Sequence, residues 1–242
     1  MARRRGAFTV RFCCGLFSWK NRPCAARQRQ EVRRSVETAY KTVRREAQAE
    51  FTEKRSRFIG RVRPVTTEAE AQEYIAALKK QYWDAAHTVY AYILRDGTRR
   101  FSDDGEPQGT AGMPTLEVLQ KAGLTDAAVT VTRYFGGILL GAGGLVRAYS
   151  HAAALAVEAG EPVEMRPCRR VRVVCDYSRY GWVEPLLRSY GTVEGADFGE
   201  AVTVTAVLPV GACPGAQDAL TERSAGQLVL MPEGDLFAPF EL

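Results

Sequence analysis

The sequence is poor in the residue patterns that bind metals. It holds two histidines, His87 and His151, and six cysteines, none of which form a C-x-x-C pair. Because structural zinc sites commonly take their ligands from such pairs, we expect no zinc site. Cys175 lies in an apolar strand pattern, where a buried free thiol is the usual state. This use of cysteine indicates a reducing compartment, so we expect a cytoplasmic protein.

Long hydrophobic runs are also absent. A membrane-spanning helix needs about 18 or more apolar residues, and no segment of this chain approaches that length. The segment of residues 10–19 is interrupted by Arg11 and lacks a small-residue cleavage site. We therefore predict neither a membrane-spanning segment nor a secretory signal.

Acidic residues are scarce at the start of the chain. Residues 1–45 contain 13 Lys and Arg but 2 Glu, a net charge of +11, whereas the remaining 197 residues carry −6. The body of the protein is therefore mildly acidic, which argues against a strongly basic nucleic-acid-binding domain but allows a local patch. Residues 1–39 show no strand or helix periodicity, and we predict a disordered basic extension. A mitochondrial-type targeting peptide, a nucleic-acid-binding arm and a true start farther downstream remain alternatives.

Alternating strand and helix patterns begin near Tyr40. They predict an α+β fold with two domains, residues 40–163 and 167–236. The division is expected at residues 158–167, where a helix pattern gives way to Gly160 and two prolines. Since each half has its own strands and helices, each is expected to have its own core.

The first domain is expected to be a small sheet with helices. Thr67 and Glu70 form a capping box, and the turn at residues 96–98 marks a hairpin. Strands are predicted at residues 58–64 with an interruption at Gly60, at 87–94, at 99–102 and at 127–135, and helices at 67–81, 114–123 and 145–158.

Basic residues mark the first of these strands. Arg57, Arg61 and Arg63 alternate onto one face. They either keep a solvated edge strand soluble or contact phosphate groups. The sequence leaves both interpretations open.

The second domain has the order β-α-β-β-α-β, the ferredoxin-like arrangement. Pro185 inside its first helix predicts a kink or a late helix start. The strands are predicted at residues 169–177, at two positions within 192–210 and at 227–231, and the helices at 178–190 and 214–224.

Two glycine-rich loops are the most informative feature of the chain. The first follows Phe101 and reads S-D-D-G-E-P-Q-G-T-A-G-M-P, and the second, G-G-I-L-L-G-A-G-G, starts at Gly136. Glycine costs backbone entropy, so it gathers where positive φ or close backbone approach is needed. Each loop leads into a helix, whose free N–H groups and positive dipole end favour an anion. The loops therefore predict an anion or nucleic-acid site, although a purely structural role is also open.

The familiar phosphate motifs do not match this region. Residues 136–141 have P-loop spacing, but Ala142 and Gly143 stand where Lys and Ser or Thr should be. A dinucleotide fingerprint starting at Gly141 would need its third glycine at Val146. We therefore expect neither an ATPase nor a dehydrogenase, and no cofactor.

Candidate residues follow from these patterns. Those for a nucleic-acid or anion site are Arg57, Arg133, Tyr134, Phe135, Gly141, Gly143, Gly144 and Arg147. A metal site is not expected, although Asp103, Asp104 and Glu106 on one turn are weak candidates for a hard cation. Ser102 with a histidine and an aspartate suggests a hydrolase, but no G-x-S-x-G elbow supports it.

Four motifs resemble one known family. They are E-K-R-S-R-F-I-G (residues 53–60), H-T-V-Y-A-Y (87–92), F-S-D-D-G-E-P-Q-G-T-A-G-M-P (101–114) and V-T-R-Y-F-G-G-I-L-L-G-A-G-G-L-V-R-A-Y-S (131–150). Together they closely resemble the Impact/YigZ family. The resemblance covers about residues 40 to 235 and does not include the basic extension.

The resemblance implies a fold and a range of functions. It implies a first domain like the second domain of ribosomal protein S five, an α/β sandwich, followed by a ferredoxin-like domain. Such a pair is similar to domains four and five of elongation factor G. Eukaryotic relatives, similar in the first domain alone, carry an RWD domain and restrain a starvation-responsive translation kinase. This chain has no room for an RWD domain, so kinase regulation is not carried over.

Two functional hypotheses remain. In the first, a non-enzymatic, translation-associated regulator binds RNA or the ribosome through the basic and aromatic candidates, with the glycine loops receiving phosphates. In the second, an enzyme acts on a phosphate-bearing or nucleotide substrate, using Asp103, Asp104 and His87. No oligomeric state is predicted.

Overall fold

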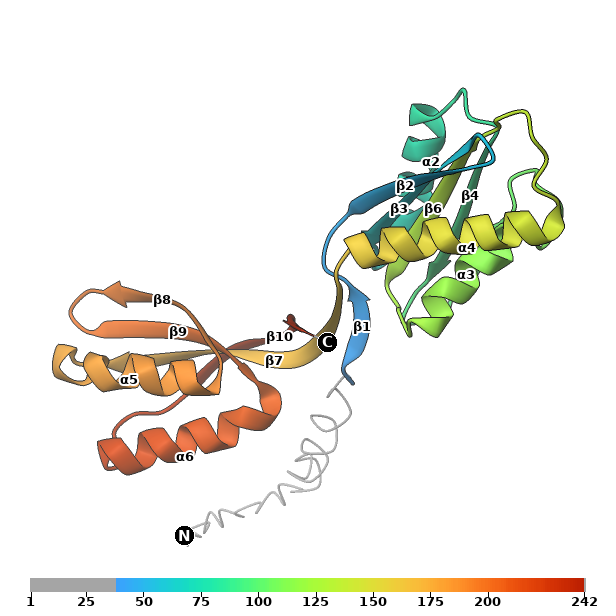
Figure 1. The fold of residues 1–242 in the computed structure, drawn as a ribbon. Helices are drawn as coiled ribbons and strands as arrows, with labels where there is room; N and C mark the ends of the chain where they lie inside the picture. Colours follow the sequence, from blue (N-terminus) through green and yellow to red (C-terminus); the bar gives the residue numbers. More distant parts are fainter. Residues whose placement is uncertain (1–37, 242) are drawn as a thin grey trace, which may run out of the picture. The chain divides into compact units, whose positions relative to one another are not determined.

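The computed structural model describes residues 38–241. The predicted basic extension, residues 1–39, therefore lies almost wholly outside the described residues, as do Cys13, Cys14 and Cys24. The described part forms two sheets, each with its own helices (Figure 1). This confirms the predicted α+β class with two domains.

The first sheet has the strand order β2-β3-β6-β4-β5. The strands are β2 (Ala47–Glu53), β3 (Ser56–Pro64), β4 (His87–Ile93), β5 (Arg99–Ser102) and β6 (Ala127–Tyr134). Helix α2 (Glu68–Gln81) packs on one face, and α3 (Gly112–Lys121) and α4 (Ala142–Ala159) pack on the other (Figure 1). Because both faces are covered, residues 127–133 of the central strand β6 are all buried.

Local sequence signals in this domain give the predicted structures. The Thr67 side chain caps α2 by accepting a hydrogen bond from the Glu70 backbone N–H at 3.2 Å. The Glu70 carboxylate accepts from the backbone N–H of Thr66 at 2.7 Å, one residue before the cap. The hairpin between β4 and β5 is also confirmed, with Asp96 accepting from the Thr98 N–H at 2.7 Å.

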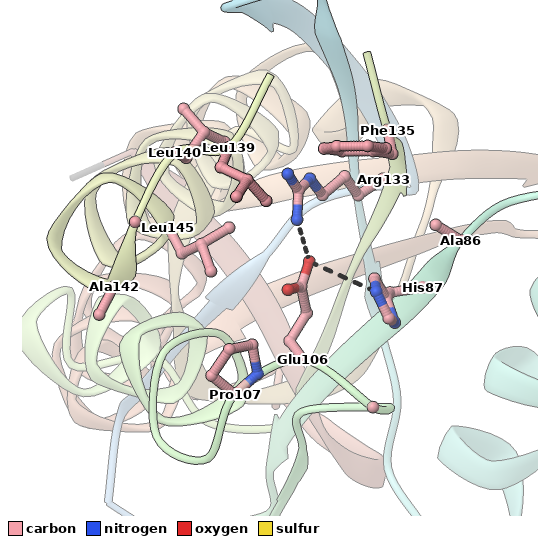
Figure 2. A pocket seen from close by; sticks show the side chains of 12 residues that line it. Ala86, His87, Glu106, Pro107, Arg133, Phe135, Leu139, Leu140, Ala142 and Leu145 are labelled. Carbon is pink, nitrogen blue, oxygen red and sulfur yellow. Dashed lines mark hydrogen bonds and ion pairs between the residues drawn. The ribbon is translucent and has the colours of Figure 1, made fainter. Parts of the chain in front are cut away.

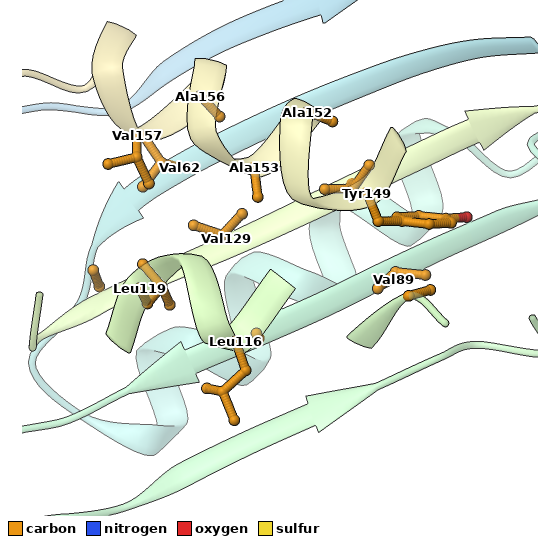
Figure 3. Close-up of a cluster of buried hydrophobic side chains, with 14 of the residues drawn as sticks. Val62, Val89, Leu116, Leu119, Val129, Tyr149, Ala152, Ala153, Ala156 and Val157 are labelled. Atoms are coloured by element: carbon orange, nitrogen blue, oxygen red, sulfur yellow. The ribbon is translucent and has the colours of Figure 1, made fainter. Parts of the chain in front are cut away.

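Small residues allow α4 to lie close to the sheet (Figure 3). Ala152, Ala153 and Ala156 are all buried on its inner face. A Cβ at Gly60 would lie 2.3 Å from the carbonyl oxygen of Ala152. The prediction that Gly60 interrupts β3 is therefore wrong, because this glycine instead makes room for the helix backbone. Tyr149, also on α4, is the largest fully buried side chain among the described residues.

Two helices begin earlier than their sequences predict. Helix α4 starts at Ala142, after the N-cap residue Gly141, rather than at Leu145, so Arg147 lies in the second turn. Helix α3 starts at Gly112 rather than at Pro114. Glycine is a poor helix former, so the sequence of these first turns predicts a loop instead of a helix. Tertiary packing of the helices on the sheet outweighs that preference.

The second sheet gives the ferredoxin-like fold. The chain order is β7, α5, β8, β9, α6, β10, and the strand order is β10-β7-β9-β8. A short 3-10 turn (Val210–Ala212) precedes α6, and Cys175 is buried as predicted. The elements are β7 (Pro162–Cys175), α5 (Tyr177–Tyr190), β8 (Thr192–Phe198), β9 (Val202–Pro209), α6 (Cys213–Ser224) and β10 (Met231–Glu241).

Two expectations for this domain are wrong, and one of two alternatives for a third is excluded. Part of the segment in which the domain division is expected, residues 162–167, belongs to the long strand β7. Of the two outcomes predicted from Pro185, a kink or a late start, the late start does not occur, since α5 begins after its cap Asp176 and continues through Pro185. The last strand starts at Met231 and ends at Glu241, past the expected domain end at residue 236.

The first strand of the described chain also belongs to the second sheet. Strand β1 (Tyr40–Val43) pairs antiparallel with residues 162–165 of β7. The first sheet begins with β2, so the predicted assignment of Tyr40 to the first domain is corrected. Sequence periodicity shows that a strand exists but carries no signal for a partner more than a hundred residues away.

Candidate functional site

The two glycine loops meet at a cavity of about 490 Å³ in the first domain (Figure 2). The first loop lines it with Gly105, Glu106 and Pro107, and the second with residues 139–142. His87 at the start of β4 and Arg133 near the end of β6 complete its polar lining. The predicted convergence of the two loops on one place is thus present.

A buried ion pair lies beneath this cavity. Oε1 of Glu106 accepts hydrogen bonds from Nη1 of Arg133 at 2.6 Å and from the hydroxyl of Tyr149 at 2.7 Å. The Glu106 and Arg133 side chains are 4% and 6% exposed. Burial, followed by the hydrogen bond to Glu106, raises the pKa of Tyr149 far above its ordinary value, so its hydroxyl stays a donor.

His87 and Ser56 extend the network. His87 Nδ1 lies 2.8 Å from the carbonyl oxygen of Asp104, to which it donates, and Nε2 lies 3.8 Å from Oε1 of Glu106. Ser56 Oγ lies 3.4 Å from Nη2 of Arg133. Nε of Arg133 is buried without a hydrogen-bond partner among residues 38–241.

The three carboxylates of the first loop each have hydrogen-bond partners in the protein, and those of Asp103 lie in the loop itself and at the start of α3. Asp103 accepts hydrogen bonds from the backbone N–H groups of Gly109, Ala111 and Gly112, at 2.7 to 3.0 Å. Asp104 accepts from the N–H of Thr88 at 2.7 Å and forms an ion pair with Lys79. With Glu106 bonded to Arg133 and Tyr149, the three carboxylates have separate partners. No metal-binding cluster of His, Cys, Asp and Glu occurs in the described part of the chain.

The second loop is held by close backbone contact. A Cβ at Gly136 would lie 2.1 Å from the carbonyl oxygen of Arg55, in the turn between β2 and β3. The Gly136 N–H donates to Ser56 Oγ at 3.2 Å. At the far end of the loop, Gly141 precedes α4 without any side-chain cap. The first backbone N–H groups of α4 therefore remain available.

The predicted binding residues fall into three places. Arg133, Phe135 and Gly141 line the cavity, and Gly143 follows in the first turn of α4. Gly144 and Arg147 line a second cavity of about 220 Å³, together with Glu53, Lys54 and His151. Arg57 and Tyr134 face away from both, because Arg57 pairs with Glu50 at 2.6 Å and the Tyr134 hydroxyl donates to Asp84 at 2.9 Å.

Arg133 occupies a different environment from the one expected of a phosphate contact. It is buried and neutralised by Glu106 instead of being open to solvent. Arg147 is exposed and forms no ion pair with any residue of 38–241, so it does not pair with Asp103 or Asp104.

Sequence reasoning missed several residues of the site. Tyr149 follows Leu145 by one helical turn on the buried face of α4, a spacing that signals its inward direction. Leu139, which lines the cavity, is 82% exposed, and an exposed leucine within a glycine loop is an unusual composition for a surface segment.

Comparisons with known proteins identify the family. The Impact N-terminal domain matches residues 54–157, and a domain of unknown function, DUF1949, matches residues 173–227. The IMPACT family member YvyE of Bacillus subtilis is 45% identical over 152 residues, which are 62% of this chain and 70% of that protein. This chain belongs to the IMPACT family.

Other relatives differ in how much of this chain they match. The family member YigZ of Escherichia coli is 32% identical over 183 residues, covering 74% of this chain and 90% of YigZ. Protein IMPACT of Rattus norvegicus is 33% identical over 98 residues, covering 38% of this chain and 31% of that protein. A crystal structure of a hypothetical protein matches with a TM-score of 0.52 and 29% identity, covering 80% of this chain and 97% of that one.

The described helices bear on the predicted absence of a membrane-spanning segment. Within residues 38–241, every helix is too short or too polar to cross a bilayer. The cytoplasmic location stays a prediction.

Proposed function

We propose that this IMPACT family chain is a non-enzymatic RNA- or ribosome-binding protein that takes part in regulating translation. RNA binds at the mouth of the cavity between the glycine loops. The observation that carries the proposal is Phe135, whose side chain is 51% exposed at this mouth. Its ring lies 5.4 Å from the guanidinium of Arg133, close to the uncapped start of α4.

Exposed aromatic rings suit single-stranded nucleic acid. Unpaired bases stack on such rings, and each stacked base contributes about 1–3 kcal/mol. The backbone phosphates then need positive groups nearby. The free N–H groups at the start of α4 and the positive end of its dipole offer such a place beside Phe135.

Charged side chains next to α4 support the same location. Lys54 and Arg147 line the second cavity and form no ion pair with any described residue. Glu53 contributes one opposing carboxylate there. The local balance is positive although the protein beyond the first 45 residues carries a net negative charge. Such a patch attracts phosphates in a salt-dependent manner.

The alternative is an enzyme acting on a phosphate-bearing or nucleotide substrate. It is favoured by His87 and Glu106, which line the cavity together. Asp103 and Asp104, the other residues of that hypothesis, use their carboxylates to bond the backbone of the first loop and of Thr88. Turnover of a nucleotide panel by the purified protein would favour this alternative.

The test compares matched variants of the full-length chain. Phe135→Ala should weaken binding of a short single-stranded RNA roughly tenfold through lost stacking, whereas Phe198→Ala, which removes a 55% exposed ring from the second domain, should not. Fluorescence anisotropy with labelled RNA measures RNA binding, and co-sedimentation with ribosomes measures ribosome binding.

Arg147 provides the charge control. Arg147→Ala should weaken binding and lower the slope of log affinity against log salt by about one. Arg188→Ala removes the same charge from an exposed site on α5 and should leave both unchanged. Because every variant keeps residues 1–37, any binding by the basic extension is common to all. Equal binding by all four variants would refute the proposed surface.

A further inference from the structure

We infer that the cavity between the glycine loops holds one unpaired nucleobase that carries an exocyclic amino group. This inference rests on the proposed RNA-binding function and names the chemistry of the ligand. It starts from the cavity walls, which are largely apolar: Pro107, Phe135, Leu139 and Leu145 line them. A flat base buries its faces against such side chains, and about 490 Å³ lies in the range of small-molecule sites.

The one acidic group in the cavity lining is Glu106. Its Oε1 already accepts from Arg133 and Tyr149. Its other oxygen, Oε2, points to the side of the cavity where Leu145 and Ala142 lie (Figure 2) and has no hydrogen-bond partner among the described residues. The side chain is 4% exposed. Oε2 is not among the buried atoms of residues 38–241 that lack a partner, so it is reachable from the cavity. A ligand that fills the cavity takes the place of water at this oxygen and must therefore present an N–H or O–H group there.

The mouth of the cavity favours a negatively charged group, whereas Glu106 favours a hydrogen-bond donor. Gly141 and Ala142 line it at the uncapped start of α4, where backbone N–H groups and the helix dipole favour an anion. A ligand with a donor at one end, a flat apolar body and a negative charge at the other end satisfies all three parts. A nucleotide has this sequence of groups, whether it is part of an RNA strand or free.

The carboxylate also selects among bases. Adenine, cytosine and guanine each carry an exocyclic amino group that can donate to Oε2 of Glu106. Uracil has none, and its single N–H lies between two carbonyl oxygens that a carboxylate repels. A hydrogen bond to a charged group corresponds to roughly a tenfold or larger preference. Nucleotides with an amino group should therefore bind about tenfold more tightly than uridine nucleotides.

The experiment measures this preference with two kinds of probe. Full-length protein is titrated with short homopolymers of adenylate, cytidylate and uridylate, and separately with AMP, CMP and UMP. We expect adenylate and cytidylate to bind about tenfold more tightly than uridylate in both series. Equal affinity for all three bases would overturn the inference while leaving RNA binding intact.

Two variants test whether the base binds in this cavity. In Glu106→Gln the amide oxygen can still accept from Arg133 and Tyr149, while the amide NH₂ replaces Oε2 and should shift the preference toward uridylate. Ala142→Phe puts a ring into the mouth at an exposed position and should weaken all three bases about tenfold or more. Thermal melts check that both variants fold. Unchanged affinity for all three bases in a folded Ala142→Phe protein would show that the base binds elsewhere.

The two probe series separate this inference from the proposed function. Selective binding of AMP and CMP without binding of any homopolymer would refute RNA binding and retain the base pocket. Binding of neither would refute both.

Discussion

The two glycine loops each lead into a helix but are held in different ways. The first is fixed by hydrogen bonds to its own carboxylates, and Asp103 accepts from the first N–H groups of α3 although that residue lies outside the helix. The second is fixed by close packing of Gly136 on Arg55, and the start of α4 has no side-chain cap. A loop that satisfies its own donors serves as a scaffold, whereas one that leaves them free can bind a ligand.

The largest effect is expected where the first loop meets the buried ion pair. Glu106→Ala leaves the Arg133 guanidinium buried without its carboxylate, which should destabilise the protein by about 3–5 kcal/mol. Urea unfolding measures this loss. Glu106→Gln keeps hydrogen-bonding capacity and should lose less. If both variants unfold at the wild-type urea concentration, the pair is not a structural element of the loop.

Asp103 tests whether the first loop depends on its internal bonds. Asp103→Ala removes a carboxylate from three backbone donors and should destabilise the protein by about 2–3 kcal/mol. Asp218→Ala, at an exposed position of α6, is the matched control and should change stability little. The comparison of the loops would fail if the two aspartate variants behaved alike.

Tyr149 should make the stability of the protein depend on alkaline pH. Tyr149→Phe removes its hydrogen bond to Glu106 and should destabilise the protein by about 1–2 kcal/mol near neutral pH. Burial raises the pKa of Tyr149 in the folded state, so its contribution to stability is complete below the unfolded value of about 10 and falls as the pH rises above it. The variant should lose less stability than wild type between pH 8 and pH 11 in urea titrations. An identical alkaline slope would contradict this.

The smallest effect, of opposite sign, is expected in the second loop. Gly143 lies in the first turn of α4, its φ is not in the left-handed region, and no atom lies within 4 Å of a Cβ built there. Gly143→Ala should therefore stabilise the protein by about 0.5–1 kcal/mol. Gly136→Ala, which meets the Arg55 backbone, should destabilise it. Thermal melts of the two variants give the signs, and a loss in both would show that the start of α4 is sterically constrained too.

Structure that depends on neighbouring residues could be predicted from the sequence. The cap at Thr67 and the hairpin at Asp96 each rest on contacts within a few residues, and both are present. The length of β10 could not be predicted, because Pro232, Gly234 and Pro239 break its strand pattern. These residues are tolerated since β10 pairs with β7 alone and lies at the sheet edge.

The candidate site divides in the same way. Glycine composition and the start of a helix placed the two loops at one site, because those are local features. The partners of Arg133 and Arg57 could not be predicted. Glu50 is brought to Arg57 by the register of β2 with β3, and Glu106 is brought to Arg133 by the tertiary packing of the first loop. The separation of Arg147 into a second cavity follows from where α4 begins, which packing decides.

The pairing of β1 with β7 has a consequence for synthesis on the ribosome. Residues 40–43 leave the exit tunnel long before residues 162–165, the segment with which they pair. The strands of the first sheet all lie between these two segments in the chain and can pair before β7 exists. Until then β1 has its contacts with residues 124–126, where the Thr125 N–H donates to the Lys41 carbonyl oxygen at 2.8 Å. Domains commonly fold in the order in which they emerge. We therefore expect β1 to lack a strand partner along its full length until β7 appears, and the second sheet to close last, when β10 completes it.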